Sequence, residues 1–278
     1  MDIGAYYTSL TSLLKEMGGV LVAFSGGVDS SLLLAAAHDA LGDRAVAVTG
    51  ISPAFPAHDL KAAEEVASRI GARWMTVETN ELDDPCFRSN PHNRCYHCKT
   101  RLFALLLEVA EREGLPCVAE GANTDDLKDF RPGFQAAREK GVRSPFIELG
   151  IGKNAIRALA RKAGLPNWDR PSSACLSSRI PYGEEITAER LHRIARSEES
   201  IRELGFAQVR VRDCGQTARI EIDAGDFSRI VEPGIRNAVV EGCRDAGYAH
   251  VTLDLRGYRT GAMNEELTAA DRRAIEGR

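Results

Sequence analysis

The sequence predicts an α/β protein in which a Rossmann-like, doubly wound parallel sheet is followed by a smaller C-terminal α+β domain. In the first half, short apolar runs alternate with amphipathic helical patterns, which is typical of a parallel sheet covered by helices on both faces. A loop rich in glycine and serine follows the first apolar run. A stretch rich in proline and serine then separates two different patterns, so we expect domains at 1–166 and 188–278 with an active-site loop and linker at 167–187.

The individual elements follow from local periodicity and from turn residues. Apolar runs of strand length predict the strands of the first domain, at 20–24, 45–49, 73–78 and 116–119. Helical periodicity predicts its helices, at 31–40, 58–70, 99–112 and 154–163. For the second domain the same criteria predict helices at 188–204 and 226–246, a turn at Gly215, and strands at 208–213, 218–223 and 249–255.

The composition describes a soluble globular protein. Of 278 residues, 44% are hydrophobic and 27% charged, and no apolar run approaches the length of a membrane span. The N-terminal sequence lacks a signal peptide, so a cytoplasmic location without membrane contact is expected. The seven cysteines suit reduced thiols, metal ligation or catalysis better than a disulfide framework. The net charge of −4 gives no global support for a nucleic-acid partner.

The stretch AFSGGVDSSLLL at residues 23–34 has the character of a phosphate-binding loop. Gly26 and Gly27 let the backbone approach a ligand, and the following helix offers unpaired N–H groups to an anion. The lysine of a Walker A loop is absent, so the loop suits a pyrophosphate, and Asp29 suits Mg²⁺. The alternative is an ordinary strand-to-helix turn. The predicted ATP-binding residues here are Ser25, Gly26, Gly27, Val28, Asp29, Ser30 and Ser31.

A second group of candidate ATP ligands follows the predicted strand 116–119. Ligands of open α/β sheets bind at the carboxyl ends of the strands, which makes this loop part of the expected site. A solvated acidic loop is the alternative, since turns favour Asn and Asp. Lys99 is expected to reach the phosphates from a helix start. The candidates are Lys99, Gly121, Asn123 and Asp125, together with Asp126 and Asp129.

The segment SGGVDSS resembles the pyrophosphate loop of the ATP pyrophosphatase (PP-loop) superfamily, which includes NAD and GMP synthetases and tRNA thiolation enzymes. The resemblance implies that ATP is split into AMP and pyrophosphate while an oxygen of the acceptor is adenylated. It does not identify the acceptor.

Three further stretches resemble the LarE family of ATP-dependent sulfur transferases. They are NRCYHCK at 93–99, EGANTDDLKDFRPGFQAAREKGVRSPF at 120–146 and PSSACLSSRIPYGEEIT at 171–187. The resemblance covers most of the chain. It implies a small-molecule nucleotide substrate, pyridinium-3,5-biscarboxylate mononucleotide, whose carboxylates become thiocarboxylates during synthesis of the nickel-pincer nucleotide cofactor.

Cys175 is the candidate sulfur nucleophile. It lies in a loop-like stretch without apolar periodicity, and Arg170 and Arg179 are close enough in sequence to favour its thiolate. The alternative is a structural thiol, which we expect instead for Cys117 in a strand and Cys243 on an apolar helix face. No role is assigned to Cys86 and Cys214.

Cys95 and Cys98 form a Cys-x-x-Cys pair with three interpretations. A structural zinc would need His92, His97 or Cys86 to complete its ligands, and a pair without metal is also open. The LarE resemblance implies a third: a 4Fe-4S cluster on Cys95, Cys98 and Cys175 that carries an extra sulfide. Other members of that family sacrifice the sulfur of the loop cysteine instead. We favour the cluster, because sacrifice of Cys175 would leave the pair without a role.

The remaining candidates concern the substrate. Arg210 and Arg212 share one strand face and would suit a phosphate, unless this is an ordinary exposed face. Tyr96 or Trp168 could stack on a pyridinium ring or simply pack, and Arg179 is also assigned to substrate binding. Four acids form the weakest candidate, a second metal site: Glu198, Glu199, Glu221 and Asp226.

Several competing functions use the same features. A tRNA thiolase would share the loop and cysteines, but an acidic chain with 6% aromatic residues lacks the expected RNA-binding surface. An amide-forming ligase would need no reactive cysteine. A non-catalytic ATP sensor with structural zinc is a third option. We expect an enzyme that uses ATP and Mg²⁺ and forms a homo-oligomer.

Overall fold

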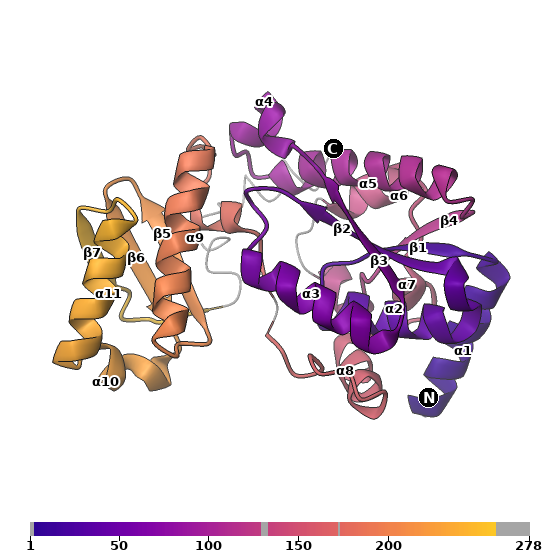
Figure 1. Ribbon diagram of the computed structural model, residues 1–278. Helices are drawn as coiled ribbons and strands as arrows, with labels where there is room; N and C mark the ends of the chain where they lie inside the picture. Colours follow the sequence, from indigo (N-terminus) through magenta and orange to yellow (C-terminus); the bar gives the residue numbers. More distant parts are fainter. Residues whose placement is uncertain (1–2, 129–132, 172, 260–278) are drawn as a thin grey trace. The chain divides into compact units, whose positions relative to one another are not determined.

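The computed structural model describes residues 3–128, 133–171 and 173–259, which divide into two compact units (Figure 1). Unit 1 comprises the described residues of Met1–Glu81 and Asn93–Ser173. Unit 2 comprises Leu82–His92 and the described residues from Ala174 onward. A short segment between the third strand and the next long helix thus belongs to unit 2. The predicted domain boundaries stay a prediction, because a compact unit need not be an independently folding domain.

Unit 1 is built on a parallel sheet of four strands in the order β3-β2-β1-β4. The strands are β1 (Val20–Ala23), β2 (Ala45–Ile51), β3 (Arg73–Glu78) and β4 (Cys117–Glu120). The helices of unit 1 are α1 (Ile3–Met17), α2 (Val28–Leu41), α3 (Ala57–Ile70), α5 (Arg94–Arg112), α6 (Gly133–Glu139), α7 (Pro145–Glu148) and α8 (Lys153–Lys162). Short 3₁₀ turns lie at η1 (Gly42–Arg44), η2 (Glu81–Asp83, ending in unit 2) and η3 (Thr124–Lys128).

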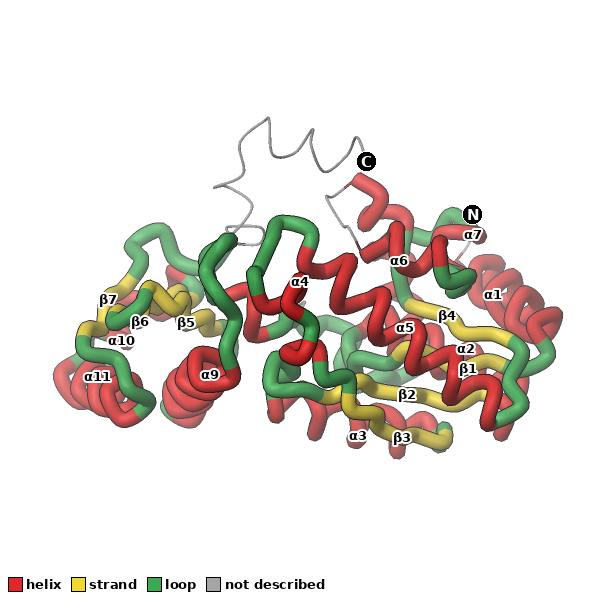
Figure 2. The backbone as a smooth tube through the Cα atoms, turned by 90° about the horizontal axis from the view of Figure 1, so that it is seen from above, coloured by secondary structure: helices red, strands yellow, loops and turns green. Residues whose placement is uncertain are grey.

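Helices cover both faces of this sheet, as the continuous apolar character of its central strands requires. Val20 and Val22 of β1 face the core formed with α1, α2, α3 and α8, whereas Leu21 faces the core formed with α5 and α6. Figure 2 shows α5 along one side of the sheet and α2 and α3 along the other. The predicted doubly wound α/β fold is therefore confirmed.

The strand order reverses between β1 and β4, which is where open α/β sheets bind ligands. The loops after these two strands pack closely. A Cβ atom on Gly121, just after β4, would lie 2.8 Å from the Ser30 amide nitrogen in α2. Only glycine fits there. Gly121 therefore allows the two predicted ATP-binding loops to pack against each other.

Unit 2 contains a three-stranded sheet in the order β5-β6-β7 with helices on one face. β5 (Val209–Cys214) and β6 (Thr217–Ile222) are antiparallel, and β6 and β7 (His250–Leu253) are parallel. The other elements of unit 2 are α4 (Pro85–Arg88), η4 (Leu176–Arg179), α9 (Ala188–Glu203), η5 (Ala224–Asp226), α10 (Phe227–Ile230) and α11 (Pro233–Asp245). This arrangement is the predicted smaller α+β part.

Two of the sequence-based helix boundaries differ most from the structure. The predicted helix 226–246 is interrupted, because Pro233 has no N–H to donate and begins the new helix α11 at its first position. The predicted helix 99–112 begins at Arg94, so Cys95, Cys98 and Lys99 lie within α5. Cysteine, tyrosine and histidine are weak helix formers, so the first turn of α5 was not predicted from the sequence.

Candidate functional site

The predicted pyrophosphate loop forms a turn between β1 and α2. Gly26 has a φ of +72°, and a Cβ atom there would lie 2.8 Å from Cα of Ala63 in α3. Gly27 is the N-cap of α2, and its N–H donates to Ser25 Oγ at 3.3 Å. The hydroxyl of Ser30 donates to the Gly27 carbonyl at 3.1 Å. The serines thus stiffen the loop, while the amides at the start of α2 lack intrahelical partners and favour an anion.

Asp29 and Lys153 are paired beside this loop. Asp29 lies in the first turn of α2, and its Oδ2 is 2.5 Å from Nζ of Lys153, the first residue of α8. The side-chain amide of Asn123 approaches the other Asp29 oxygen at 3.5 Å. Lys153 also donates its backbone N–H to Asp125 Oδ2 at 2.7 Å. The sequence analysis missed Lys153, because it is a single lysine on a helix predicted without reference to the loop.

The loop after β4 is ordered by its own side chains. Asn123 is buried, and its Oδ1 accepts from the Asp125 N–H at 3.0 Å. Its backbone N–H donates to Asp126 Oδ2, also at 3.0 Å. These contacts order the loop next to Asp29, and its role in ATP binding stays a prediction. Asp129 lies outside the described residues.

Lys99 is held at the end of β4. Its ammonium group is 2.5 Å from Oε2 of Glu120, whose side chain is only 5% exposed, and it lies 4.9 Å from the Phe103 ring centroid. Glu120 directly precedes Gly121. The Lys99 ammonium group is therefore positioned at the end of β4, the strand next to β1, and its charge is balanced by the buried carboxylate of Glu120.

The aromatic candidates contact other side chains of unit 1. The Tyr96 hydroxyl donates to Glu139 Oε2 at 2.6 Å, and this bond raises the pKa of the Tyr96 phenol. The Trp168 ring lies 4.9 Å from the Arg161 guanidinium. Cys95 is exposed and Cys98 is partly buried, and their spacing places them on the same side of the first turns of α5.

In unit 2, Arg179 organises the loop that carries Cys175. Its guanidinium donates to both carboxylate oxygens of Glu198, at 2.8 and 3.0 Å, and both side chains are fully buried. It also donates to the Ala174 and Cys175 carbonyls, at 2.6 and 2.8 Å. Burial alone would raise the pKa of Glu198, but the charge and hydrogen bonds of Arg179 lower it to about 2. Cys175 itself is exposed.

The predicted substrate arginines are buried rather than displayed on an open strand face. Arg212 forms a two-pronged ion pair with Glu221, at 2.9 and 2.7 Å, and donates to the Ser178 carbonyl at 2.7 Å. Arg210 faces the Tyr258 ring at 5.4 Å. Burial and the nearby Arg179 lower the pKa of Arg210 to about 10, so it remains charged at neutral pH.

The four candidate acids are not gathered into a metal site. Glu198 pairs with Arg179 and Arg202, and Glu221 pairs with Arg212 and Arg219. Glu199 is exposed on α9, and Asp226 lies in η5. Among the described residues, no three His, Cys, Asp or Glu side chains are placed so that they could hold a metal ion.

Of the other thiols, Cys243 has the structural role that the sequence predicts. Cys243 is buried in the core of unit 2, and burial raises the pKa of its thiol to about 11. Cys117 packs against the main core of unit 1 and is partly buried, whereas Cys86 and Cys214 are exposed. Arg170, expected near Cys175, forms an ion pair with Asp59 of α3.

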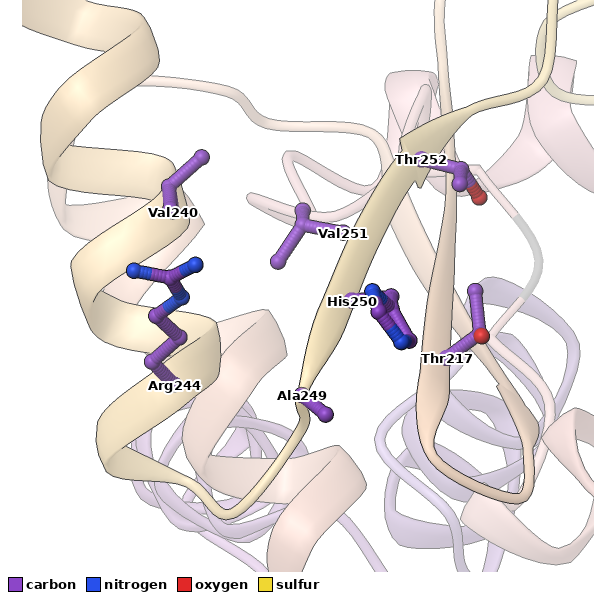
Figure 3. Close-up of a pocket in the computed structure, with 7 residues that line it drawn as sticks. All are labelled: Thr217, Val240, Arg244, Ala249, His250, Val251 and Thr252. Atoms are coloured by element: carbon purple, nitrogen blue, oxygen red, sulfur yellow. The ribbon is translucent and has the colours of Figure 1, made fainter.

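A separate hollow of about 590 Å³ occurs in unit 2 between α11 and β7 (Figure 3). Val240 and Arg244 of α11 line one side, and His250 lies on β7 opposite them. None of the predicted site residues lines it.

A parallel sheet whose first strand leads into Ser-Gly-Gly-Val-Asp-Ser-Ser, with acidic and lysine side chains around that turn, defines an α/β nucleotide-binding protein of the PP-loop class. None of the helices in the described part of the chain combines the length and apolar character needed to cross a membrane. No family model matches the chain.

Comparison with known proteins gives the particular family. An uncharacterised protein of Synechocystis is 44% identical over 94% of this chain and 97% of its own length. Pyridinium-3,5-bisthiocarboxylic acid mononucleotide synthase of Lactiplantibacillus plantarum is 36% identical over 94% of this chain and 95% of its own. The tRNA-specific 2-thiouridylase of Thermus thermophilus is 30% identical, but over only 56% of this chain and 53% of its own. The chain belongs to the family of the second of these proteins, the LarE family, as the sequence motifs predicted.

Proposed function

We propose that this protein is an ATP-dependent, AMP-forming sulfur transferase that acts on pyridinium-3,5-biscarboxylate mononucleotide. The observation that carries the proposal is the 36% identity, over 94% of the chain, to the pyridinium-3,5-bisthiocarboxylic acid mononucleotide synthase. A product with two thiocarboxylates implies a precursor with two carboxylates. Each conversion exchanges one carboxylate oxygen for sulfur.

ATP supplies the leaving group. A carboxylate is a poor electrophile, so one of its oxygens attacks the α-phosphorus of ATP, pyrophosphate leaves, and an acyl adenylate forms. Asp29 is the proposed ligand of Mg²⁺ on the phosphates. With Asp29 holding Mg²⁺, the ammonium group of Lys153 would be able to donate to the phosphates and would supply the charge that the loop lacks. The amides at the start of α2 hold the pyrophosphate.

Substrate recognition is assigned to the predicted arginines. Arg210 and Arg212 share one face of β5, where both are buried and Arg212 is paired with Glu221, and a phosphate monoester is the anion proposed for these two guanidinium groups. Arg179 fixes the backbone around Cys175 through the carbonyls of Ala174 and Cys175. Tyr96 is proposed to stack on the pyridinium ring.

The sulfur source involves three thiols. Cys95 and Cys98 lie about one helical turn apart on α5, and exposed Cys175 directly precedes η4 as its N-cap. Cys95, Cys98 and Cys175 are the proposed protein ligands of a 4Fe-4S cluster, because three thiolates leave one of its irons without a protein ligand. When bound, such a cluster supplies an iron that is not held by protein and can carry sulfide. Attack of sulfide on the acyl carbon expels AMP and leaves the thiocarboxylate.

The alternative source is the sulfur of Cys175 itself. Its thiolate would displace AMP to form a thioester, and loss of the Cα proton would then break the Cβ–S bond. That elimination leaves the thiocarboxylate on the substrate and dehydroalanine at position 175. The two sources differ in iron content and in the mass of the spent protein.

The test is product analysis with Mg²⁺, ATP and the biscarboxylated nucleotide, using protein purified without oxygen. Formation of AMP, pyrophosphate and a substrate whose mass shows oxygen replaced by sulfur is the expected result. ADP as the main product would overturn the proposal. Sulfur transfer to tRNA but not to the nucleotide would favour a thiolase, the function named for the Thermus relative.

A further inference from the structure

The side chain of Asn167 is bound directly to the pyrophosphate loop. Its Nδ2 donates to the Gly26 carbonyl at 2.8 Å and to Ser31 Oγ at 2.9 Å. An amide nitrogen has two hydrogens, and both are used here. Asn167 is 6% exposed and Ser31 is fully buried, so water does not compete for these bonds. The contact joins the loop after β1 to a residue 141 positions further along the chain.

This contact fixes the orientation of one peptide group. The peptide between Gly26 and Gly27 is planar and trans, so its C=O and N–H point in opposite directions. Because Asn167 holds the Gly26 carbonyl, the Gly27 N–H points to the other side, where it donates to Ser25 Oγ. Glycines adopt many conformations, and a Gly-Gly turn without this contact would sample other peptide orientations.

Asn167 is itself held in place. Its backbone carbonyl accepts from the Arg170 N–H at 3.2 Å, and the next residue, Trp168, packs against Arg161. Further along, buried Asp59 of α3 accepts from Arg170 Nη2 at 2.7 Å and from Ser173 Oγ at 2.6 Å.

The segment that leads to Cys175 is therefore attached at one end to the pyrophosphate loop and at the other to α3. The loop also rests on α3, since Gly26 lies against Ala63. Loop, helix and segment form one packed arrangement within unit 1.

From this arrangement we infer that Asn167 is a positioning residue of the pyrophosphate site. It fixes the conformation of the Gly26–Gly27 turn before α2, where the phosphates are proposed to bind, and couples this loop to the segment that precedes Cys175. The inference rests on the proposed use of ATP. Asn167 touches neither the reacting carboxylate nor the sulfur in this role, so its loss should weaken phosphate binding and slow adenylation while the site for the nucleoside persists.

Two substitutions test the inference. Asn167→Ala removes both hydrogen bonds. Asn167→Asp keeps the shape, but its carboxylate faces the Gly26 carbonyl oxygen and cannot donate to it. Asn154→Ala, an exposed asparagine on α8, is the matched control. Binding of Mg²⁺ with inorganic pyrophosphate, and separately of AMP, is measured by calorimetry, alongside KM for ATP, kcat and thermal unfolding.

We expect the dissociation constant for pyrophosphate to rise about tenfold in Asn167→Ala, the effect of one to two buried hydrogen bonds, and further in Asn167→Asp. The dissociation constant for AMP should change less than about twofold, and kcat should fall. An equal loss of affinity for pyrophosphate and for AMP would overturn the inference while leaving the proposed function intact. Unchanged pyrophosphate binding and kcat would do the same. A wild-type protein that binds neither pyrophosphate nor ATP would contradict the proposed function and the inference together.

Discussion

Lys153 Nζ lies 2.5 Å from Asp29 Oδ2, although the two residues are 124 positions apart in the chain. Both side chains are partly exposed, at 30% and 26%, at the start of their helices. Asp29, the predicted metal ligand, and Lys153, a cation suited to binding phosphates, thus form an ion pair. On the proposed function, Asp29 would hold Mg²⁺ and Lys153 would donate to the phosphates when Mg·ATP is bound.

Replacing Asp29 with Asn should slow AMP formation by at least about 100-fold, because the metal-bound phosphates lose a positioning ligand. Release of pyrophosphate is the measurement. Asp43→Asn, an exposed residue of η1 just after α2, should behave as wild type. Normal pyrophosphate release by the Asp29 variant would exclude the metal-ligand role.

Replacing Lys153 with Met should raise KM for ATP roughly 10- to 100-fold, the loss expected for a charge-assisted bond to phosphate. AMP binding should be affected less. Lys162→Met at the exposed end of the same helix is the control. If Lys153 only balances Asp29 in the absence of nucleotide, KM will stay unchanged, and the proposed transfer of its charge to the phosphates will be wrong.

Replacing Cys95, Cys98 or Cys175 with Ser, one at a time, distinguishes the two sulfur sources. If the three thiols hold a cluster, each variant should lose most of its iron and its sulfur transfer but keep AMP formation, because two protein ligands hold a cluster poorly. Iron content and intact mass are measured before and after one turnover.

A sacrificial Cys175 gives a different result in the same experiment. Only the Cys175 variant would then lose sulfur transfer, and spent wild-type protein would lack one sulfur and two hydrogens. Iron-free protein with that mass loss would reject the cluster. An unchanged Cys175 after several turnovers with added sulfide would reject the sacrificial route.

The buried pair Arg179–Glu198 predicts a pH-dependent contribution to stability. The pKa of Glu198 is lowered from 4.5 to about 2 in the folded protein, so its stabilisation is present above the unfolded value and is lost as the pH falls from about 4.5 toward 2. Glu198→Gln leaves Arg179 without its counter-charge and should cost about 3–5 kcal/mol at neutral pH. The gap in unfolding temperature between wild type and variant should narrow in acid. Exposed Glu199→Gln should show neither effect.

Two substitutions separate the ring of Tyr96 from its hydroxyl. If the ring stacks on the pyridinium substrate, Tyr96→Phe should keep the substrate KM, while Tyr96→Ala should raise it roughly 2- to 30-fold. Steady-state kinetics at saturating ATP provide the comparison. An equal rise in both variants would assign the effect to the bond with Glu139 and reject stacking.

The sheet and its nucleotide loop were predictable because their signals are local. The apolar runs around Val20–Ala23 and Ala45–Ile51 and the glycines at 26 and 27 act within a few residues, so strand, turn and helix could be placed in order. The break before Pro233 and the early start of α5 at Arg94 were missed for the same reason. Apolar periodicity continues across the break before Pro233, so one helix was predicted where there are two. It is absent from the first turn of α5, so the predicted start of that helix was too late.

The sequence by itself determined the class of fold, the identity of the pyrophosphate loop and the set of candidate thiols, since each depends on residue types at short spacing. Only the tertiary structure decided which distant side chains meet: Lys153 with Asp29, Asn167 with Gly26, and Arg179 with Glu198. It also decided that Arg210 and Arg212 are buried in ion pairs and stacking contacts rather than exposed. These pairings depend on chain topology and on the cost of burying an unpaired charge, and neither is encoded in local periodicity.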